Sequence, residues 1–481
     1  MTSNFSRRSF LATSATSAIA AGSSAPAAAP HAQKRPNVLF ILTDQWRFSS
    51  FGHSTDGVVR TPHIDQLGAE GAVCTRAYAA NPVCTPNRSC LLTGRYSHQT
   101  GMITNNLMLP PTEVCWPQIF ADAGCKTHYI GKWHMDGTEK PGYVPPGWRR
   151  RGLTTFEGFN RGHVYHTPWG FADDGSPLIP KDVGEAPDYY EPTYQTDLAI
   201  EFMKQNRDTP FACYLSLGPP HTPFRPPKDF DLYSESDIQL RPNVPQQHEK
   251  QARKDLAGYY GLCESLDHEV GRLLEHLSTS GLAENTLVVF TSDHGELAGS
   301  HGKYRKGEPE EESLHVPLLA RMPGKIEGGR EVDALINSID IMPTLLSLCG
   351  LEDPGTCSGK NMADALCGSK SAERQDAIYC EGKLTSATTA QKPKGQKKSG
   401  DSKSWRSVVT DRYKLTVSGG ERRVAHLFDL KNDPFEQKNL ATISKHRAVR
   451  DDLVDRLLEF RDSSGDSWPE KPVAAKVMYE A

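Results

Sequence analysis

The chain has 481 residues, 37% hydrophobic and 24% charged, and is long enough to bury a large core as one large domain plus a smaller one. Its 55 lysines and arginines stand against 59 aspartates and glutamates, for a net charge of -4. This balance excludes the uniformly basic surface that non-specific nucleic-acid binding requires, so no nucleic-acid partner is expected.

The first 32 residues predict an export signal rather than part of the fold. Arg7 and Arg8 stand just before Phe10, and the weakly apolar run of Ala, Ser and Thr that follows ends in small residues that suit cleavage. This order is typical of a twin-arginine signal peptide, with an ordinary secretory signal as the alternative. Either signal predicts a periplasmic or secreted protein, and the first implies the twin-arginine export machinery as a partner.

Cysteine content and hydropathy constrain the mature protein further. Eleven cysteines are scattered without the Cys-x-x-Cys pairs of metal sites, so a dense disulfide framework is not indicated. One or two bridges stay open, and the odd count leaves at least one cysteine unpaired. The signal holds no cysteine for a lipid anchor, and no later stretch reaches the roughly 18 apolar residues of a membrane span, so no span is expected.

Three short apolar runs predict central strands of a parallel sheet, each followed at once by polar residues. The runs and the residues that follow them are 37–43 with Asp44, 211–217 with His221, and 286–291 with Asp293 and His294. Because parallel strands bring their carboxyl ends to one edge of a sheet, where open α/β sheets bind ligands, we expect these polar residues to lie close together.

Two helices are predicted between and after these strands. Residues 256–277 carry apolar side chains at a period near 3.6, which predicts a helix that covers the sheet. Residues 336–348 predict a second helix despite Pro343. The elements together predict an α/β fold with a large, mostly parallel sheet between layers of helices.

After about residue 370 the pattern changes to short strands separated by turns. Strands are predicted at 405–409, 413–417 and 426–430, and a terminal helix at 447–460, which indicates a small antiparallel sheet packed by that helix. We therefore expect a larger domain over 35–370 and a smaller one over 371–481. The smaller one includes a basic low-complexity segment at 385–403, expected to be a loop.

The stretch CTPNRSCLLTGR at 84–95 allows two interpretations. In the first, residues 88–93 form a short helix that ends at Gly94, and Cys84 is a small buried apolar residue. In the second, Cys84 stands at a helix N-terminus beside the cation of Arg88, where an activated, anion-handling residue is favoured.

This stretch resembles the signature of the type I sulfatases, in which the first Cys or Ser is converted to formylglycine. Other family motifs occur in the family's order, and the resemblance covers nearly everything from residue 35 onward. It implies the alkaline phosphatase-like fold of that family and the hydrolysis of sulfate esters. The further motifs are NVLFILTD at 37–44, GKWH at 131–134, GPPHTPF at 218–224, TSDHGELAGSHGKYRKGEPEEESLHVPLL at 291–319 and, near the end, DRYKLTV and HLFDLKNDPFEQKNL.

A sulfate ester is stable and charged, so its enzyme must neutralise the sulfate oxygens, supply a nucleophile and protonate a poor leaving group. The resemblance implies that Lys132 and Lys306 clamp the sulfate. It also implies a partner, the formylglycine-generating or sulfatase-maturing enzyme that modifies the cysteine.

The remaining catalytic roles follow from the same resemblance. Cys84 would become the formylglycine nucleophile, and Arg88 would hold it by charge-assisted hydrogen bonds. His134 would bind the formylglycine hydrate, and His221 would act as general acid toward the leaving oxygen. Taken singly, each residue has a structural alternative as a turn cap, a core histidine or a surface charge, and their joint order favours the site.

The resemblance also implies a metal site formed by Asp44, Gln45, Asp293, His294 and the formylglycine from Cys84. Hard carboxylate oxygens suit Ca²⁺. Many sulfatases have a second Asp at the position of Gln45 and an Asn at the position of His294. These departures remove a charge and add an imidazole, which leaves Mg²⁺ or Mn²⁺ open.

Residues 148–169 interleave arginines with aromatic residues, a combination that suits a sulfated carbohydrate, and a surface loop without a ligand is the alternative. We expect a sulfatase that acts on sulfated saccharides, with a broad arylsulfatase as the near alternative. A phosphonate or phosphate monoester hydrolase, and a glycan-binding protein with unmodified Cys84, are the alternatives from other classes. His301 has no assigned role. The arginines and aromatic residues of the segment are Arg149, Arg150, Arg151, Arg161, Trp148, Phe159, Tyr165 and Trp169.

Overall fold

The computed structural model describes residues 35–54, 58–178, 189–369, 372, 374–384, 403–419 and 423–468. The predicted export signal and nearly all of the predicted basic loop lie outside these residues. Arg35–Ala481 form one unit by their internal contacts, so a domain boundary near residue 370 stays a prediction.

The main sheet has eight strands in the order β5-β4-β6-β1-β7-β8-β2-β9. Its neighbours are parallel except around β8, which is antiparallel to both β7 and β2, so the predicted mostly parallel sheet is confirmed. The three predicted strands are the central ones, β6, β1 and β7. The strands are β1 (Asn37–Asp44), β2 (Ala72–Cys74), β4 (Lys126–Lys132), β5 (Thr155–Phe159), β6 (Phe211–Pro220), β7 (Thr286–Ser292), β8 (Leu318–Arg321) and β9 (Arg330–Val332).

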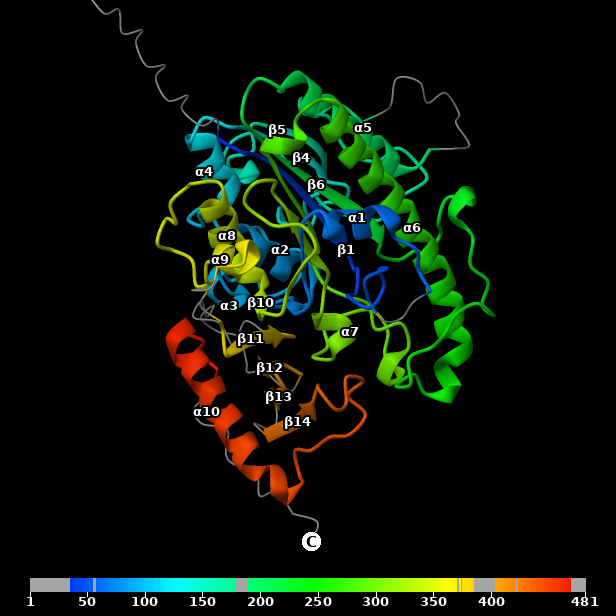
Figure 1. Cartoon of the computed structure of the whole chain (residues 1–481), viewed down its shortest axis with the longest axis vertical. Coiled ribbons are helices and arrows are strands. Elements are labelled where there is room, and N and C mark those ends of the chain that lie inside the picture. The colour runs from blue at the N-terminus through cyan, green and yellow to red at the C-terminus, as the bar shows by residue number, and fades with distance from the viewer. Residues whose placement is uncertain are drawn as a thin grey trace, which may run out of the picture. The chain divides into compact units, whose positions relative to one another are not determined.

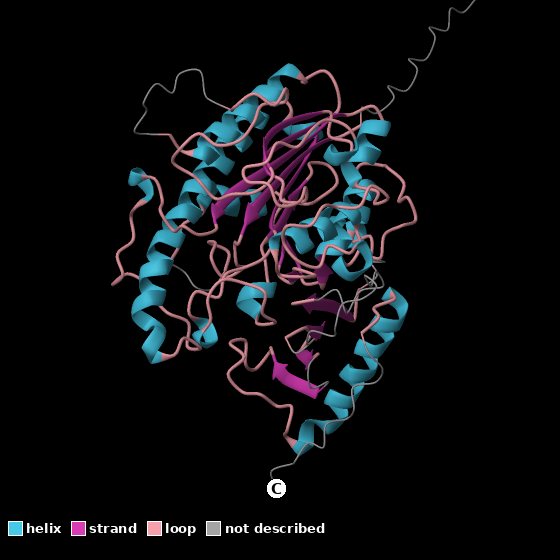
Figure 2. Cartoon of the chain, turned by 180° about the vertical axis from the view of Figure 1, so that it is seen from behind, coloured by secondary structure: helices cyan, strands magenta, loops and turns pink. Residues whose placement is uncertain are grey.

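Helices cover both faces of this sheet (Figures 1 and 2). Alternate residues of β1 enter different cores, since Phe40 packs in one cluster of buried side chains and Ile41 in another. A strand buried on both faces explains the unbroken apolar run that predicted it. The helices on one face are α1 (Pro62–Ala69), α5 (Glu191–Gln205) and α6 (Glu249–Thr279); those on the other are α2 (Cys84–Thr93), α4 (Trp116–Asp122) and α8 (Ile341–Leu348); shorter helices are α3 (Ser97–Thr100), α7 (Glu311–Leu314) and α9 (Ala363–Cys367).

The helix predicted at 336–348 is wrong at its start. Ile336–Asn337 form the short strand β10, which pairs with β3 (Ala77–Tyr78), and a 3-10 turn at Ser338–Asp340 precedes α8. The backbone N–H of Asn337 donates to Asp340 Oδ2 over 2.7 Å, which fixes the turn. Pro343 then falls in the first turn of α8, where the missing N–H has no intrahelical acceptor to lose.

The C-terminal sheet is antiparallel, with four strands in chain order, and α10 (Arg447–Ser464) packs on it. Its core joins Tyr379 and Leu415 of the sheet to Leu453 and Leu457 of the helix. The predicted small sheet and terminal helix are confirmed, and one further strand, β11, precedes those predicted. The strands are β11 (Ala377–Gly382), β12 (Trp405–Thr410), β13 (Tyr413–Ser418) and β14 (Arg423–Asp429).

A buried ion pair joins α3 to this second sheet. His98 Nδ1 lies 2.7 Å from Glu381 Oε2, and both side chains are at most 3% exposed. Ser97 Oγ donates to the other carboxylate oxygen over 2.6 Å. Burial by itself lowers the pKa of His98, but the Glu381 charge outweighs it and the pKa is raised.

Glu381→Gln should therefore destabilise the protein by about 3–5 kcal/mol near neutral pH, because it leaves a buried imidazolium without its counter-charge. The raised pKa of His98 gives a contribution that is present below the ordinary His pKa and is lost as pH rises through the raised value. The cost of Glu381→Gln should shrink in the same direction. Denaturant unfolding at several pH values measures it.

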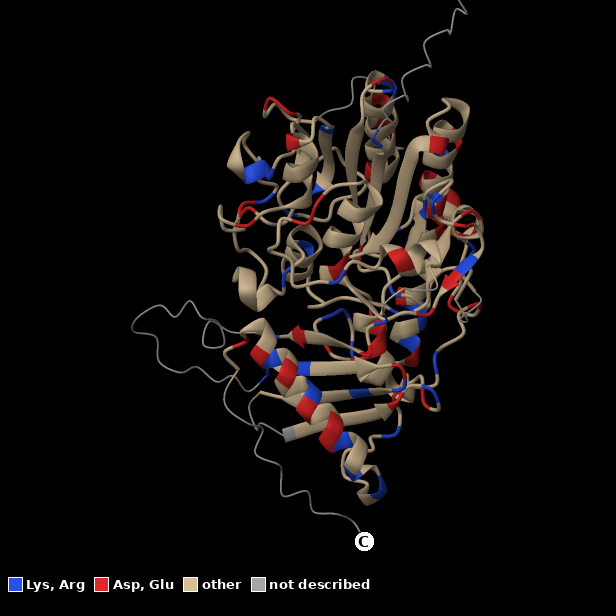
Figure 3. Ribbon diagram, turned by 60° about the vertical axis from the view of Figure 1, so that its left-hand side comes forward, with Lys and Arg blue, Asp and Glu red and all other residues tan. Residues whose placement is uncertain are grey.

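Arg456→Gln is the control, since charges of both signs alternate along α10 (Figure 3) and the Arg456 pair with Asp452 is 37% and 61% exposed. Its effect should stay below about 0.5 kcal/mol. Equal losses in the two variants would contradict a special role for the buried pair.

Candidate active site

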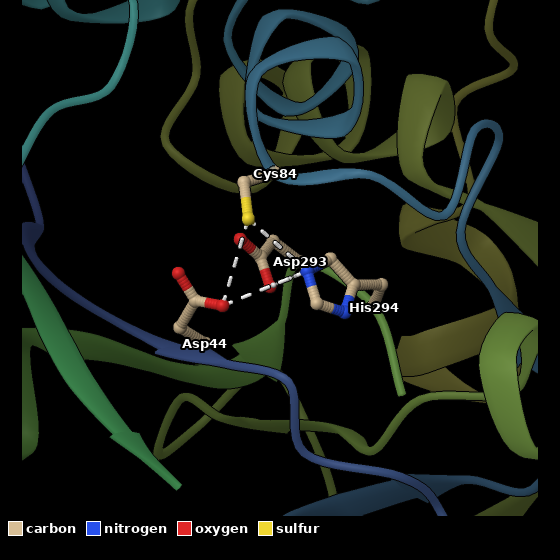
Figure 4. Close-up of side chains that lie close together, drawn as sticks. All are labelled: Asp44, Cys84, Asp293 and His294. Atoms are coloured by element: carbon tan, nitrogen blue, oxygen red, sulfur yellow. Dashed lines mark hydrogen bonds and ion pairs between the residues drawn. The ribbon is translucent and has the colours of Figure 1, made fainter. Parts of the chain in front are cut away.

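Asp44, the last residue of β1, and Asp293 and His294, which follow β7, meet the first residue of α2 at one edge of the main sheet (Figure 4). One ligand atom from each of Asp44, Cys84, Asp293 and His294 lies within 4.8 Å of the others, and all four side chains are buried. The expectation that strand-end residues lie close together is confirmed for Asp44, Asp293 and His294.

The backbone around α2 places Cys84 at the start of that helix. Val83 is extended, with φ -140° and ψ 140°, and the helix begins at Cys84 rather than at residue 88. Pro86 has no N–H to leave unpaired in the first turn. Gly94, at φ 65°, ends the helix in the left-handed conformation that glycine favours. Cys84 therefore occupies the position that the second interpretation of this stretch required.

Arg88 is fully buried and ties the two carboxylates together. Its Nε donates to Asp293 Oδ2 over 2.9 Å, and its Nη2 donates to Asp44 Oδ2 over 3.2 Å. Nη1 donates to the backbone carbonyl of Lys132 and to Ser216 Oγ. The hydrogen bonds of the guanidinium thus run to β1, β4, β6 and the residue after β7. None of these bonds involves Cys84, so the predicted contact of Arg88 with a modified Cys84 stays a prediction.

Two lysines reach the same cluster. Lys132 Nζ donates to Asp44 Oδ2, and Lys306 Nζ lies 2.9 Å from Cys84 Sγ. Burial raises the pKa of Asp44, but Lys132, His221, Lys306 and Arg88 together hold it well below its usual range. Asp44 is thus an ionised carboxylate surrounded by cations.

Cys84 is unlike the other ten cysteines. Burial and the Asp44 charge raise its pKa, but Lys132, Lys306 and His294 outweigh them and lower it to about 5. His294 Nε2 lies 3.3 Å from the sulfur. Burial raises the pKa of the other ten thiols, and all eleven cysteines, which lie within the described residues, are free of disulfide bonds.

Gln45 lies beside the cluster. Its backbone N–H donates to Asp293 Oδ1 over 3.1 Å, and its Nε2 donates to Glu296 Oε2 over 2.5 Å. Its Oε1 is buried without a hydrogen-bond partner among the described residues. An unpaired buried amide oxygen costs free energy unless a donor or an ion satisfies it.

The two predicted catalytic histidines lie in the same electropositive surroundings. Burial, Lys132 and Arg88 lower the pKa of His134, and neither of its ring nitrogens has a partner among the described residues. His221 Nδ1 lies 2.8 Å from the Thr222 carbonyl, and burial and Lys306 lower the pKa of His221 well below its usual value.

His163 is a site residue that the sequence did not identify. Its ring stacks on that of His221 with centroids 3.5 Å apart and planes 4° apart, and its Nε2 lies 3.2 Å from Lys132 Nζ. The one signal for it in the sequence is its place in the segment 148–169, where arginines alternate with aromatic residues. Tyr165 in that segment donates from its hydroxyl to the carbonyl of His221 over 2.9 Å.

The arginines of 148–169 largely serve the fold. Arg150 is 2% exposed and pairs with Asp173, and Arg151 is buried and donates to the carbonyl of Leu109. Arg149 and Arg161 also have partners within the chain, at Asp136 and the Thr138 carbonyl. Because Arg150 and Arg151 are buried, the expectation that the arginines of this segment read a sulfated carbohydrate does not hold for these two.

Cations gathered around one acidic sulfur favour chemistry on an anionic ester. The Sulfatase family model matches residues 36–351, and the model described as N-sulphoglucosamine sulphohydrolase, C-terminal, matches residues 299–463. The chain belongs to the sulfatase family and is a sulfuric ester hydrolase.

Its relatives span most of its length. An ulvan-active sulfatase of Formosa agariphila is 33% identical over 90% of this chain and 82% of that protein. An endo-4-O-sulfatase of Bacteroides thetaiotaomicron is 29% identical over 96% and 98%. A crystal structure of the sulfatase yidJ from Bacteroides fragilis has a TM-score of 0.80 at 27% identity and covers 91% of this chain and 98% of that one. No helix within the described residues is long and apolar enough to cross a membrane.

The low pKa of Cys84 predicts a thiolate in unmodified protein. With metal removed by a chelator, the ultraviolet absorbance of the thiolate should rise with a midpoint at pH about 5, because the neighbouring cations favour the charged form. The difference between unmodified protein and Cys84→Ala isolates this signal from the ten other thiols. A midpoint at or above the usual cysteine value would contradict the electrostatics described for the cluster.

Proposed function

We propose that this protein hydrolyses sulfate esters of sulfated carbohydrates through a formylglycine made from Cys84 and a divalent metal ion. The observation that carries the proposal is the acidic sulfur of Cys84, which lies within hydrogen-bond distance of Lys306 and His294 beside two carboxylates. Relatives named as ulvan-active sulfatase and endo-4-O-sulfatase support a saccharide as the substrate.

The residues fit a hard divalent cation. Asp44 and Asp293 offer carboxylate oxygens, Gln45 offers an amide oxygen without a partner, and His294 offers a ring nitrogen. Oxygen ligands suit Ca²⁺ or Mg²⁺, and the imidazole leaves Mn²⁺ open. A bound ion would supply Lewis-acid polarisation of the reacting oxygens. Ionised Asp44, whose pKa is held low, is ready to bind it.

The chain's own groups bind and orient the ester. A formylglycine at position 84 would supply, in its hydrated form, an oxygen nucleophile that a thiol cannot supply. Lys132, which contacts Asp44, and Lys306, which contacts Cys84, would neutralise the sulfate oxygens. His134, whose two ring nitrogens have no partner, would orient the hydrate by hydrogen bonding.

His221 is proposed as the general acid. The contact of Nδ1 with the Thr222 carbonyl places a proton on Nδ1, so Nε2 of the neutral ring carries the lone pair. A bound sulfate would offset the charges of Lys306 and Lys132 and raise the pKa of His221, so that Nε2 takes up a proton for the leaving oxygen. The stacked ring of His163 would hold His221 in place.

Location and maturation complete the proposal. Arg7 and Arg8 with the following apolar run support export by the twin-arginine machinery to the periplasm or beyond. Conversion of Cys84 requires a formylglycine-generating or sulfatase-maturing enzyme as a partner in the cell.

The modification and the reaction class can be tested together. In protein from the native host, the tryptic peptide 77–88 should be lighter than its thiol form by the difference between a cysteine and an aldehyde. That protein should hydrolyse nitrophenyl sulfate faster than phenylphosphonate or a phosphate ester, and Cys84→Ala should abolish hydrolysis. Cys90→Ala, in the same helix, is the matched control and should retain it. An unmodified thiol throughout would reject the mechanism, and preferred hydrolysis of phosphonate would favour the other ester class.

The general-acid role predicts a dependence on the leaving group. His221→Ala should lower kcat for a simple alkyl sulfate by about 10²–10⁴-fold, because the alkoxide needs a proton as it leaves. The loss should be much smaller with nitrophenyl sulfate, whose phenolate leaves readily without one. His446→Ala, just before α10, serves as the control. Equal losses on both esters would assign His221 to binding instead.

A further inference from the structure

A cavity of about 440 Å³ opens beside the proposed active site. Two of the residues that line it are neighbours of site residues in the chain: Thr222 follows His221, and Arg305 precedes Lys306. Another lining residue is Glu296, which accepts the hydrogen bond from Gln45. The cavity therefore begins one residue away from the proposed general acid and from a proposed sulfate clamp.

This position decides which part of a substrate would enter the cavity. If Lys306 holds a sulfate with its leaving oxygen toward His221, the lining residues next to those two in the chain, Thr222 and Arg305, would lie near the remaining sugar. Its volume lies within the roughly 300–1,000 Å³ of small-ligand pockets, so it can hold a sugar and part of its neighbour. Phe224 and Tyr304 add aromatic surface for the apolar faces of sugar rings.

Three cations line the cavity, and their charged ends have no acceptor within the described part of the chain. Arg225, Lys254 and Arg305 are exposed, and within the described residues none of their side chains forms a hydrogen bond or an ion pair. This contrasts with Arg253, next to Lys254 in α6, which pairs with Glu249. The unpaired donors are thus concentrated where the substrate would extend.

Two carboxylates, Glu296 and Asp255, lie in the same cavity and offset only part of the charge of the three cations. Glu296 accepts from the backbone N–H groups of Ala298 and Arg305 and from Gln45 Nε2, and Asp255 accepts from Gln251 over 2.8 Å. Neither carboxylate forms an ion pair with the three cations, whose side-chain donors have no acceptor within the described residues. The cavity offers the donor set that recognises a carboxylate or a sulfate.

We infer that this cavity binds a second anionic group of the sulfated saccharide, a carboxylate or another sulfate, and so selects polyanionic saccharides over simple sulfate esters. The inference rests on the proposed function for the position of the first sulfate. Arg225 and Arg305 would bind the second anion by paired N–H donors, and Lys254 would add a point charge from α6.

The test compares three sulfated disaccharides: one with a uronate as the second sugar, the same molecule with the carboxyl reduced to an alcohol, and one with a second sulfate instead. Binding is measured by calorimetry in the Cys84→Ala background, which cannot turn the ligand over. Matured protein supplies kcat/KM for the same saccharides and for nitrophenyl sulfate. The variant combines Arg225→Gln, Lys254→Gln and Arg305→Gln, and Lys250→Gln, an exposed lysine one turn earlier in α6, is the control.

The inference predicts that an anionic disaccharide binds at least about tenfold more tightly than the reduced one, and that the triple variant loses this preference while Lys250→Gln keeps it. The ratio of kcat/KM for the anionic saccharide to that for nitrophenyl sulfate should fall similarly. Preference for the uronate or for the second sulfate identifies the source of the anion. Equal binding of anionic and reduced disaccharides, or a preference that survives the triple variant, would overturn the inference. Anion-dependent binding without hydrolysis of any sulfate ester would instead overturn the proposed function alone.

Discussion

The site depends on a guanidinium held away from water. Arg88 is fully buried, and its removal from water is compensated by charge-assisted hydrogen bonds to Asp44 and Asp293. Without that cation the two carboxylates would repel each other in a low-dielectric interior. Because the same guanidinium also contacts the carbonyl of Lys132 and Ser216, it fixes the ends of four neighbouring strands relative to one another. The position of Cys84 follows, since Arg88 lies one turn further along the same helix.

Cations and anions alternate around Cys84, so the pKa values of the groups there shift in different directions. Burial and the Asp44 carboxylate raise the pKa of Asp293, although Arg88 and His294 oppose them, while the surrounding cations hold the pKa of Asp44 low. Lys306 and His294 stabilise a negative charge on the sulfur of Cys84. Among the described residues assigned to the site, the buried side-chain atoms without a hydrogen-bond partner are the ring nitrogens of His134 and the amide oxygen of Gln45. These are the atoms to which the proposal gives an external partner.

Much of this arrangement could be predicted from local pattern. The strands at 37–43, 211–217 and 286–291 are buried on both faces, so apolar content alone revealed them. β4, with the mixed sequence KTHYIGK, offers no such run, and it is held by pairing with β5 and β6. The predicted start of the helix at 336–348 is wrong for a related reason. Ile336 and Asn337 pair with strand β3, which lies far away in the sequence.

The candidate site shows the same limit. The residues named from motif order are brought together, but His163 joins them through the packing of a loop in which no motif marks it. Arg150 and Arg151 turn inward because a carboxylate and backbone carbonyls lie within reach. No pattern of residues in the sequence predicts these contacts. The direction of a side chain in a loop is set by tertiary contacts, which the spacing of apolar residues in the sequence does not predict.

The eleven thiols carry a consequence for the lifetime of the molecule. Nine are buried and two are partly so, and none is joined to another. Apart from Cys84, their raised pKa values keep them as neutral thiols, the form that reacts slowly with oxidants. Oxidant can reach most of them only when the surrounding core opens, so their rate of oxidation is governed by local and global unfolding. Slow thiol oxidation in this protein would therefore be a direct record of its kinetic stability.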